Sequence, residues 1–323
     1  MRNETTTFSS IFAENIHNYL HEKVLLGNKI TSYIYPLKLF DTFVNEKKLK
    51  ENILTKELMY TWLKLRNGEK RTNQSHRASI LRGFSKYMNM INDKNYVLPQ
   101  KLYSCGDKYN AHIYSKDELD LIFYKIDNLV EEQPNKQLKN RSSQIIFRLL
   151  YMCGLRISEA LNIKIKDFDK EQKLLIIRHA KKDKDRLVPL NDKLNALIMD
   201  YINEFHILST DESFLFKGKN NLPFTRFTIN KRLKTILNLC KIEYNGQTLH
   251  SFRHTFCVHC LRKWAMEGKD LMVYLPILKT FLGHESFRET AYYLKLTADV
   301  YPNITHVLEK QYNYLIPRLE EES

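Results

Sequence analysis

The residues that suggest a chemical reaction most directly lie in two short boxes towards the C-terminal end. The first box reads LHSFRHTF and contains His250 and Arg253, and the second reads LGHE and contains His284. Residues three apart on a helix lie on one face, so His250 and Arg253 would stand side by side. With Tyr293, nine residues after His284, they supply a guanidinium, two imidazoles and a phenol, but no cluster of carboxylates. This set suits a protein nucleophile that acts on a phosphodiester without a metal ion.

Two more motifs with basic residues stand upstream of these boxes. Arg156 lies in GLRISE, three residues before Glu159, and Lys181 lies in RHAKKDKDRLVPL, residues 178–190. Taken in order, G-L-R-x-S-E, the basic stretch, H-x-x-R and L-G-H with its following tyrosine resemble the motifs of the tyrosine recombinase (phage integrase) family. The resemblance spans about half of the chain, and its motifs occur in the order that the family has.

The resemblance implies roles for both arginines and for the first histidine. Arg156 and Arg253 would neutralise charge on the non-bridging phosphate oxygens, because a guanidinium is planar, permanently charged and matched to two oxygens. His250 would exchange a proton with the attacking phenol. Glu159 would support the site from behind, paired with Arg156. The plainer interpretations are surface ion pairs for the arginines and a core position for His250, and we interpret the neighbouring His254 as structural.

A lysine, a second histidine and a tyrosine complete the site that the resemblance implies. Lys181 aligns with a lysine that the family carries on a hairpin, and it would protonate the departing 5′ oxygen. Lys182 and Lys184 are the neighbouring alternatives for this role. His284 stands where the family has His or Trp, and it would donate a hydrogen bond to a phosphate oxygen. Tyr293 would be the nucleophile.

Tyr292 is the alternative nucleophile, directly beside Tyr293. On a helix the two side chains would point about 100° apart, so only one of them can face the site. The family places its tyrosine nine residues after the histidine of L-G-H, and this spacing favours Tyr293.

These residues require a scaffold, for which the sequence predicts a mostly helical domain with a small antiparallel sheet. Ser115 and Glu118 have the spacing of a capping box that begins a helix, and Gly154 is placed to end a later one. Two strands, at 173–179 and 186–190, would form the hairpin that carries Lys181. A short third strand is expected at 214–216, and further helices at 140–153, 191–205, 225–241, 251–263 and 276–282.

The first 105 residues are predicted to form a separate helical bundle. Between residues 73 and 91 the apolar residues recur on one face, and basic residues stand at the start and on the opposite face. By resemblance, residues 1–105 are a core-binding domain, 106–112 a linker, and 113–323 the catalytic domain. A solvated helix face is the plainer interpretation of these charges. The residues expected to contact the DNA backbone are Lys70, Arg71, Arg77, Arg82 and Lys86.

Composition narrows the class of partner. The chain has 323 residues and a net charge of +14, which favours a polyanion such as DNA, RNA or an anionic membrane. It has no run of 18 apolar residues, and its start, MRNETTTFSS, lacks the core of a signal peptide, so a cytoplasmic location is expected. Five cysteines argue against a disulfide framework. Cys257 and Cys260 lack a second C-x-x-C, so we expect buried thiols rather than zinc, and no cofactor.

These observations predict a mainly α chain with a small antiparallel β-sheet, which the resemblance makes a two-domain DNA clamp. The resemblance implies a site-specific recombinase that cuts and rejoins DNA through a 3′-phosphotyrosyl intermediate, for integration or excision of a mobile element or for dimer resolution. It also implies a tetramer on specific DNA sites, in which a C-terminal helix with apolar residues from Ile304 to Ile316 docks on the neighbouring subunit. The plainer interpretation of these apolar residues is that the helix packs on its own domain. The alternatives are relaxation of DNA by a type IB topoisomerase-like enzyme, and a non-catalytic DNA-binding regulator.

Overall fold

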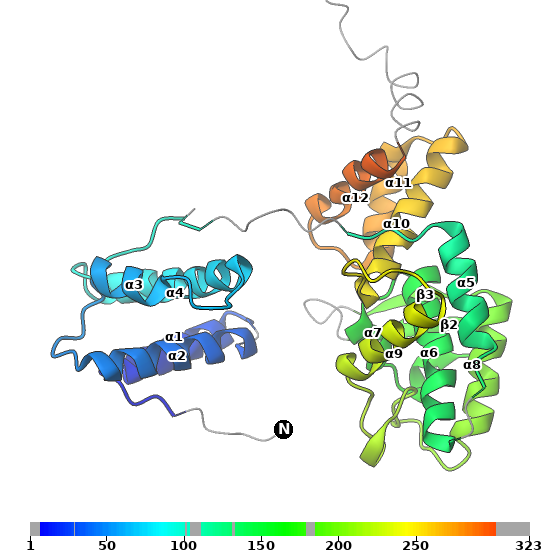
Figure 1. Ribbon diagram of the computed structural model, residues 1–323, viewed down its shortest axis with the longest axis horizontal. Helices are drawn as coiled ribbons and strands as arrows, with labels where there is room; N and C mark the ends of the chain where they lie inside the picture. The colour runs from blue at the N-terminus through cyan, green and yellow to red at the C-terminus, as the bar shows by residue number, and fades with distance from the viewer. Residues whose placement is uncertain are drawn as a thin grey trace, which may run out of the picture. The chain divides into compact units, whose positions relative to one another are not determined.

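Helices predominate, and one small antiparallel sheet accompanies them, in the computed structural model of this chain (Figure 1). The structure describes residues 7–28, 30–100, 102–103, 111–130, 133–178 and 185–301. The predicted fold class is confirmed. The basic stretch with Lys181, Lys182 and Lys184, most of the expected linker and the expected C-terminal helix lie outside the described residues. None of the described helices has the length and apolar character needed to cross a membrane.

The chain divides into two units, Met1–Tyr109 and Asn110–Ser323. The described residues of the first unit form four helices around an aromatic core, in which the Phe84 ring lies 6.3 Å from Phe12 and 5.6 Å from Tyr19. The expected apolar stripe between 73 and 91 supplies Phe84 and faces this core. The helices are α1 (Ala13–Leu25), α2 (Thr31–Lys47), α3 (Lys56–Leu63) and α4 (Arg71–Ile91).

Arg77 corrects one of the expected DNA contacts. Its side chain is buried, and its guanidinium donates to both carboxylate oxygens of Glu69, at 2.8 and 2.6 Å, and to the Trp62 carbonyl at 2.7 Å. The same guanidinium lies 4.7 Å from the centre of the Trp62 ring. Because these partners use its donors, Arg77 holds the start of α4 in place and is not available to a phosphate.

The other four residues that were expected to contact the DNA backbone remain candidates for this role. Lys70, Arg71 and Lys86 are exposed, and Arg82 is half-buried. The Nε of Arg82 donates to the Pro99 carbonyl at 2.7 Å.

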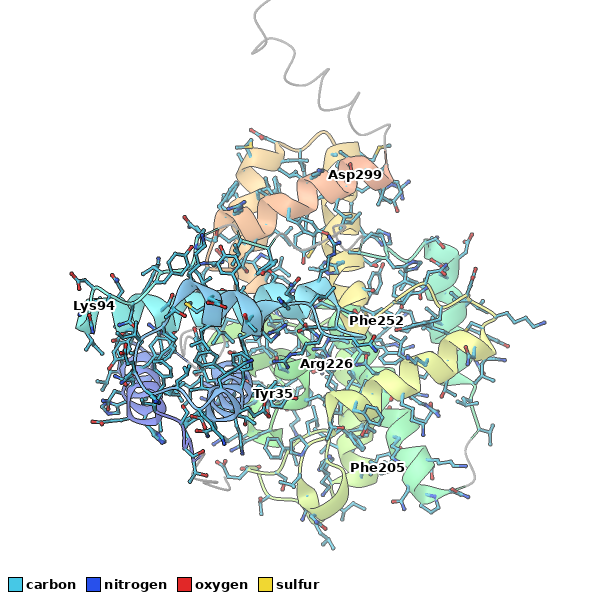
Figure 2. All side chains as sticks on the ribbon, turned by 60° about the vertical axis from the view of Figure 1, so that its left-hand side comes forward. Tyr35, Lys94, Phe205, Arg226, Phe252 and Asp299 are labelled. Carbon is cyan, nitrogen blue, oxygen red and sulfur yellow. The ribbon has the colours of Figure 1, made fainter. Side chains whose placement is uncertain are left out.

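In the second unit, α10 packs against both α6 and α12. Phe252 of α10, labelled in Figure 2, is fully buried, with its ring 5.1 Å from Phe147 of α6 and 4.9 Å from Tyr114. The Ser115 capping box is present, because the Ser115 and Glu118 side chains each accept a hydrogen bond from the backbone N–H of the other residue.

The described helices of the second unit are α5 (Lys116–Asp127), α6 (Pro134–Met152), α7 (Ile157–Leu161), α8 (Asp192–Phe205), α9 (Arg226–Leu239), α10 (Leu249–Met266), α11 (Leu271–Leu282) and α12 (Phe287–Val300). Short 3-10 turns lie at Ile165–Asp167 and Lys219–Asn221.

The sheet has three strands in the order β1 (Phe168–Asp169), β2 (Leu174–Ile177) and β3 (Arg186–Pro189), all antiparallel. The predicted hairpin is therefore present, with Ile177 opposite Arg186. The prediction of a third strand at 214–216 is wrong, because Phe214 makes only an isolated bridge to Lys164. The third strand is β1, whose two residues are too few to show the alternation by which a strand is predicted.

Gly154 makes the turn that brings the end of α6 to α10. Its φ is +59°, and a Cβ at this position would lie 2.7 Å from the Phe256 ring of α10. A larger residue would therefore be strained and would also clash. The turn places Arg156, the N-cap residue of α7, beside the residues of α10.

Candidate active site

Arg253 of α10 is the buried centre of the site, with 1% of its surface exposed. Its Nη1 donates to the Gly154 carbonyl at 2.5 Å, and its Nη2 donates to the Leu282 carbonyl at 3.0 Å. Burial lowers the pKa of Arg253, and the positive charge of Arg156 lowers it further. The contacts join α10 to the ends of α6 and α11, so Arg253 is fixed in one position.

Arg156 lies beside Arg253 and is more open to solvent. Its Nη1 donates to Glu159 Oε1 at 2.9 Å, and its backbone N–H donates to Glu159 Oε2 at 2.9 Å. Among the described residues, the Nη2 atom makes only long contacts, at 3.5 Å to the Gly283 carbonyl and 3.9 Å to a Glu289 oxygen. A guanidinium with one firmly held edge and one loosely held edge can offer the second edge to an anion.

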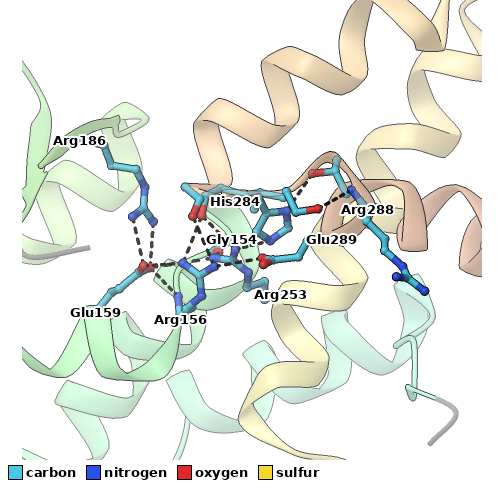
Figure 3. Close-up of polar contacts among 12 residues, drawn as sticks. Gly154, Arg156, Glu159, Arg186, Arg253, His284, Arg288 and Glu289 are labelled. Atoms are coloured by element: carbon cyan, nitrogen blue, oxygen red, sulfur yellow. Dashed lines mark hydrogen bonds and ion pairs between the residues drawn. The ribbon is translucent and has the colours of Figure 1, made fainter. Parts of the chain in front are cut away.

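Glu159 lies between the guanidinium groups of Arg156 and Arg186, as Figure 3 shows. Arg186 donates Nη1 to Oε1 at 3.1 Å and Nη2 to Oε2 at 2.8 Å, in a two-point contact. Burial acts to raise the pKa of Glu159, but hydrogen bonds and charge from Arg186 and Arg156 outweigh it and bring the pKa to about 2. The sequence analysis did not include Arg186 in the site, although the R-x-V-P motif was a visible signal.

His284 joins the site from the turn after α11. Arginine only donates, so the 2.8 Å contact makes the His284 Nε2 the acceptor from Arg253 Nη2. The ring proton of a neutral imidazole then sits on Nδ1, which lies 2.9 Å from Thr290 Oγ1. This tautomer is assigned from the partners. Nε2 therefore orients Arg253 in this state, and the hydrogen bond from His284 to a phosphate oxygen stays a prediction.

Tyr293 of α12 lies next to these groups, but it is buried, with 3% of its surface exposed. Its ring is parallel to the His284 ring at a centroid distance of 6.0 Å. Burial strongly raises the pKa of Tyr293, with a smaller raising contribution from Cys257, while Arg253 lowers it. The neighbouring Tyr292 is 42% exposed. The phenol of Tyr293 is therefore buried in its protonated form at neutral pH.

His250 and His254 lie one turn apart on α10, with their rings in an edge contact at 4.5 Å. Burial, followed by the charges of Arg253, Arg156 and Arg226, lowers the pKa of His250 to about 4. A neutral imidazole at pH 7 can accept a proton. Arg226, labelled in Figure 2, begins α9, and the sequence analysis missed it because no motif marks it.

His254 is more closely tied to the site than a purely structural interpretation implied. It is 8% exposed, and its ring lies 5.6 Å from Tyr293 and 6.2 Å from Tyr292. Burial and the nearby charges lower its pKa to about 3, and its Nδ1 has no hydrogen-bond partner among the described residues.

The two lowered histidine pKa values make stability depend on pH. Between pH 6.5 and about 4, the unfolded chain binds protons at His250 and His254 that the folded chain does not, so stability falls as the pH is lowered. We expect His254→Gln to lose less stability than the wild type when the pH falls from 7 to 5, as measured by urea unfolding. The exposed His21→Gln in the first unit is the control. An equal loss of stability in all three proteins would show that His254 does not contribute to the pH dependence.

The structure thus brings together Arg156, Glu159, His250, Arg253, His284 and Tyr293 within one unit. Lys181 lies outside the described residues. The described cysteines, among them Cys257 and Cys260, are free thiols. Across the described ranges, no group of three or more His, Cys, Asp or Glu side chains is arranged to hold a metal ion.

Comparison with known proteins gives independent evidence of the family and the fold of this chain. The model of the family described as "Phage integrase family" matches residues 117–299. A tyrosine recombinase XerC of Staphylococcus aureus (strain bovine RF122 / ET3-1) is 28% identical over 315 residues, which cover 94% of this chain and 95% of the relative. A tyrosine recombinase of Pseudothermotoga lettingae is 26% identical over 289 residues, 87% of this chain and 92% of the relative. The crystal structure of the XerH site-specific recombinase in a post-cleavage complex has a TM-score of 0.66 at 21% identity, covering 88% of this chain and 80% of that chain, and shows that the fold is shared.

Proposed function

We propose that Tyr293 is the nucleophile of this chain, which belongs to the phage integrase family and is a site-specific DNA recombinase of the tyrosine type. The observation that supports this assignment is that Tyr293 lies beside Arg253 and His284 within one packed unit. The two alternative functions are less favoured, because the matching family and its named relatives are integrases and recombinases.

In the proposed reaction, the Tyr293 oxygen attacks the scissile phosphorus while the bond from phosphorus to the 5′ oxygen breaks. The products are a 3′-phosphotyrosyl link and a free 5′ hydroxyl, and attack by a partner strand's 5′ hydroxyl reverses the step. His250, a neutral base at pH 7, takes the phenol proton. One phosphodiester bond replaces another at each step, so no external energy source is required.

The two arginines would divide the work of stabilising the phosphate. Arg156 offers its loosely held Nη2 edge to a non-bridging oxygen, and Arg253 supplies a fixed positive charge from its buried position. His284 keeps Arg253 oriented and reaches the phosphate only if its ring nitrogens exchange partners. Lys181 is proposed as the acid that protonates the departing 5′ oxygen.

Trapping the covalent adduct tests this function. A nicked duplex that carries the recombination site loses the short 5′-hydroxyl strand after cleavage, so the adduct accumulates and shifts on a denaturing gel. We expect the wild-type chain to form this adduct in the presence of EDTA, because the proposed groups supply the base, the acid and the positive charge themselves. Activity that disappears in EDTA and returns with magnesium would contradict the mechanism.

We also propose that the first unit contacts the DNA backbone through Lys70, Arg71, Arg82 and Lys86. Each neutralised phosphate contributes a slope of roughly −0.9 to the dependence of log affinity on log salt concentration. The double variant Arg82→Gln and Lys86→Gln is expected to have a shallower slope in a filter-binding salt titration. An unchanged slope would show that these two residues face solvent in the complex.

The proposed assembly is a tetramer on two recombination sites, linked by C-terminal helices that dock on neighbouring subunits. Exposed apolar residues on α11, namely Met272, Val273 and Ile277, offer a surface on which the apolar stripe from Ile304 to Ile316 can be buried. Deletion of residues 305–323 should leave DNA binding intact and remove the largest complexes from a native gel. Persistence of those complexes in the deletion variant would refute the docking proposal.

A further inference from the structure

We infer that Arg186 is a positioning residue for the recombination reaction: it holds Glu159 so that Arg156 keeps its loosely held Nη2 edge for the phosphate. This inference rests on the proposed function and adds to it a residue that makes no proposed contact with DNA. The relevant contacts are those that Arg186, the first residue of β3, makes with α7 and with the end of α11.

The side chain of Arg186 connects three elements of the site. It is 12% exposed, and its two terminal nitrogens bind both oxygens of the Glu159 carboxylate. Its Nε donates to the Phe281 carbonyl at 3.1 Å. At Gly283, the residue before His284, an added Cβ would lie 3.1 Å from Arg186 Nη1. The guanidinium therefore packs tightly between α7 and the turn that carries His284.

The geometry at Glu159 explains why a second arginine matters. The carboxylate is 8% exposed and has a single negative charge, and the guanidinium groups of Arg156 and Arg186 both compete for it. While Arg186 binds both oxygens, the Arg156 guanidinium makes one hydrogen bond to Glu159, through Nη1. Without Arg186, a buried carboxylate would lose its two-point partner and would be expected to draw Arg156 into a two-point pair. The loosely held Nη2 edge of Arg156 would then be lost to the phosphate.

Arg186 also anchors the start of β3, the strand that pairs with β2. β3 begins at Arg186, and its side chain attaches this strand to Glu159 and to the carbonyl of Phe281. The loss of Arg186 would therefore disturb both the arginine pair and the base of the hairpin. These two effects can be separated by changing Glu159 as well.

The test is a double-variant cycle in single-turnover cleavage of the nicked duplex at saturating protein. We expect Arg186→Ala to cleave about 10- to 100-fold more slowly, the range typical when an outer residue that orients an active group is lost, with DNA affinity within about threefold. Adding Glu159→Gln to Arg186→Ala should restore much of the lost cleavage rate, because a neutral amide does not form a two-point ion pair with Arg156. A merely structural Arg186 would instead give losses that add in the double variant.

Two controls make the outcome clear. Arg141→Ala removes an arginine of α6 that pairs with Glu204 of α8, away from the hairpin and the site, and it should cleave at the wild-type rate. Arg186→Lys keeps the charge but not the two-point contact, so it should fold and still cleave more slowly. The inference would be overturned if both Arg186→Lys and Arg186→Ala cleaved at the wild-type rate. It would also be overturned if the double variant with Glu159→Gln cleaved no faster than Arg186→Ala. Failure of the wild type to form an adduct would instead refute the proposed function.

Discussion

Replacing Tyr293 with phenylalanine is expected to abolish the covalent protein–DNA adduct while leaving DNA binding nearly unchanged. The substitution removes only the hydroxyl that would attack phosphorus, and the buried ring can keep its packing against the His284 ring. The lost hydroxyl leaves Arg253 and Cys257 without this hydrogen-bonding neighbour, which should cost stability of about 1 kcal/mol. The complete loss should therefore appear in chemistry, with only this modest change in stability.

Tyr292→Phe is the matched control, since Tyr292 is adjacent on α12 and 42% exposed. Both variants and the wild type are incubated with the nicked duplex and separated on a denaturing gel, and DNA binding is measured by native gel shift. Tyr292→Phe should form the adduct normally. If it is Tyr292→Phe that fails and Tyr293→Phe that succeeds, the exposed tyrosine is the nucleophile.

Replacing Arg253 with lysine is expected to slow cleavage by at least about 10²-fold, the scale of losing preorganised electrostatic stabilisation of the transition state. The charge remains, but one ammonium cannot serve the Gly154 and Leu282 carbonyls and His284 Nε2 together. Lysine is the informative substitution, because alanine would leave buried acceptors without donors and destabilise the fold.

Single-turnover cleavage, DNA affinity and thermal unfolding should be measured together for Arg253→Lys. Arg262→Lys is the control on the same helix, where the guanidinium lies 4.3 Å from the Tyr301 ring, away from the phosphate-handling groups. Affinity should change far less than the cleavage rate, because many other cations contact the DNA. Equal losses in affinity and rate would identify Arg253 as a general DNA ligand.

For the proposed nucleophile Tyr293, burial would restrict cleavage to complexes in which α12 has moved. Burial raises the pKa of Tyr293, and a protonated phenol is a poor nucleophile. Thr290 and Thr297 of the same helix are also buried, which shows how firmly α12 is packed in this state. Movement of α12, which immediately precedes the C-terminal segment, would link nucleophile release to the docking of that segment. The deletion of residues 305–323 tests this link, since it should also change adduct formation.

Short-range features of the site could be predicted from the sequence. The pairing of His250 with Arg253 on one helix face, the Ser115 capping box and the Arg156–Glu159 contact each depend on residues three apart. Backbone geometry alone brings such residues together, whatever surrounds the helix. The motif order likewise predicted the family, which the match to residues 117–299 confirms.

Long-range features required the tertiary structure. Glu159 and Arg186 are separated by 27 residues, and Arg253 and the Gly154 carbonyl by 99. Their contacts depend on how α6, α7, α10, α11 and the sheet pack, and no local pattern encodes this. The strand β1 was missed for a related reason, because two residues join the sheet only where a partner strand is already placed.

Burial shows most clearly the difference between what the sequence determines and what only the tertiary structure decides. The sequence determined that Arg77, Arg156 and Arg253 are cations and that Tyr293 is a phenol at the family's spacing. Only the packed structure decided that Arg77 is enclosed by Glu69 and the Trp62 ring, and that Tyr293 is stored inside the unit. The physical reason is that a residue's charge and hydrogen-bonding groups are fixed by its type, whereas access to solvent or DNA depends on neighbours that folding brings from distant parts of the chain.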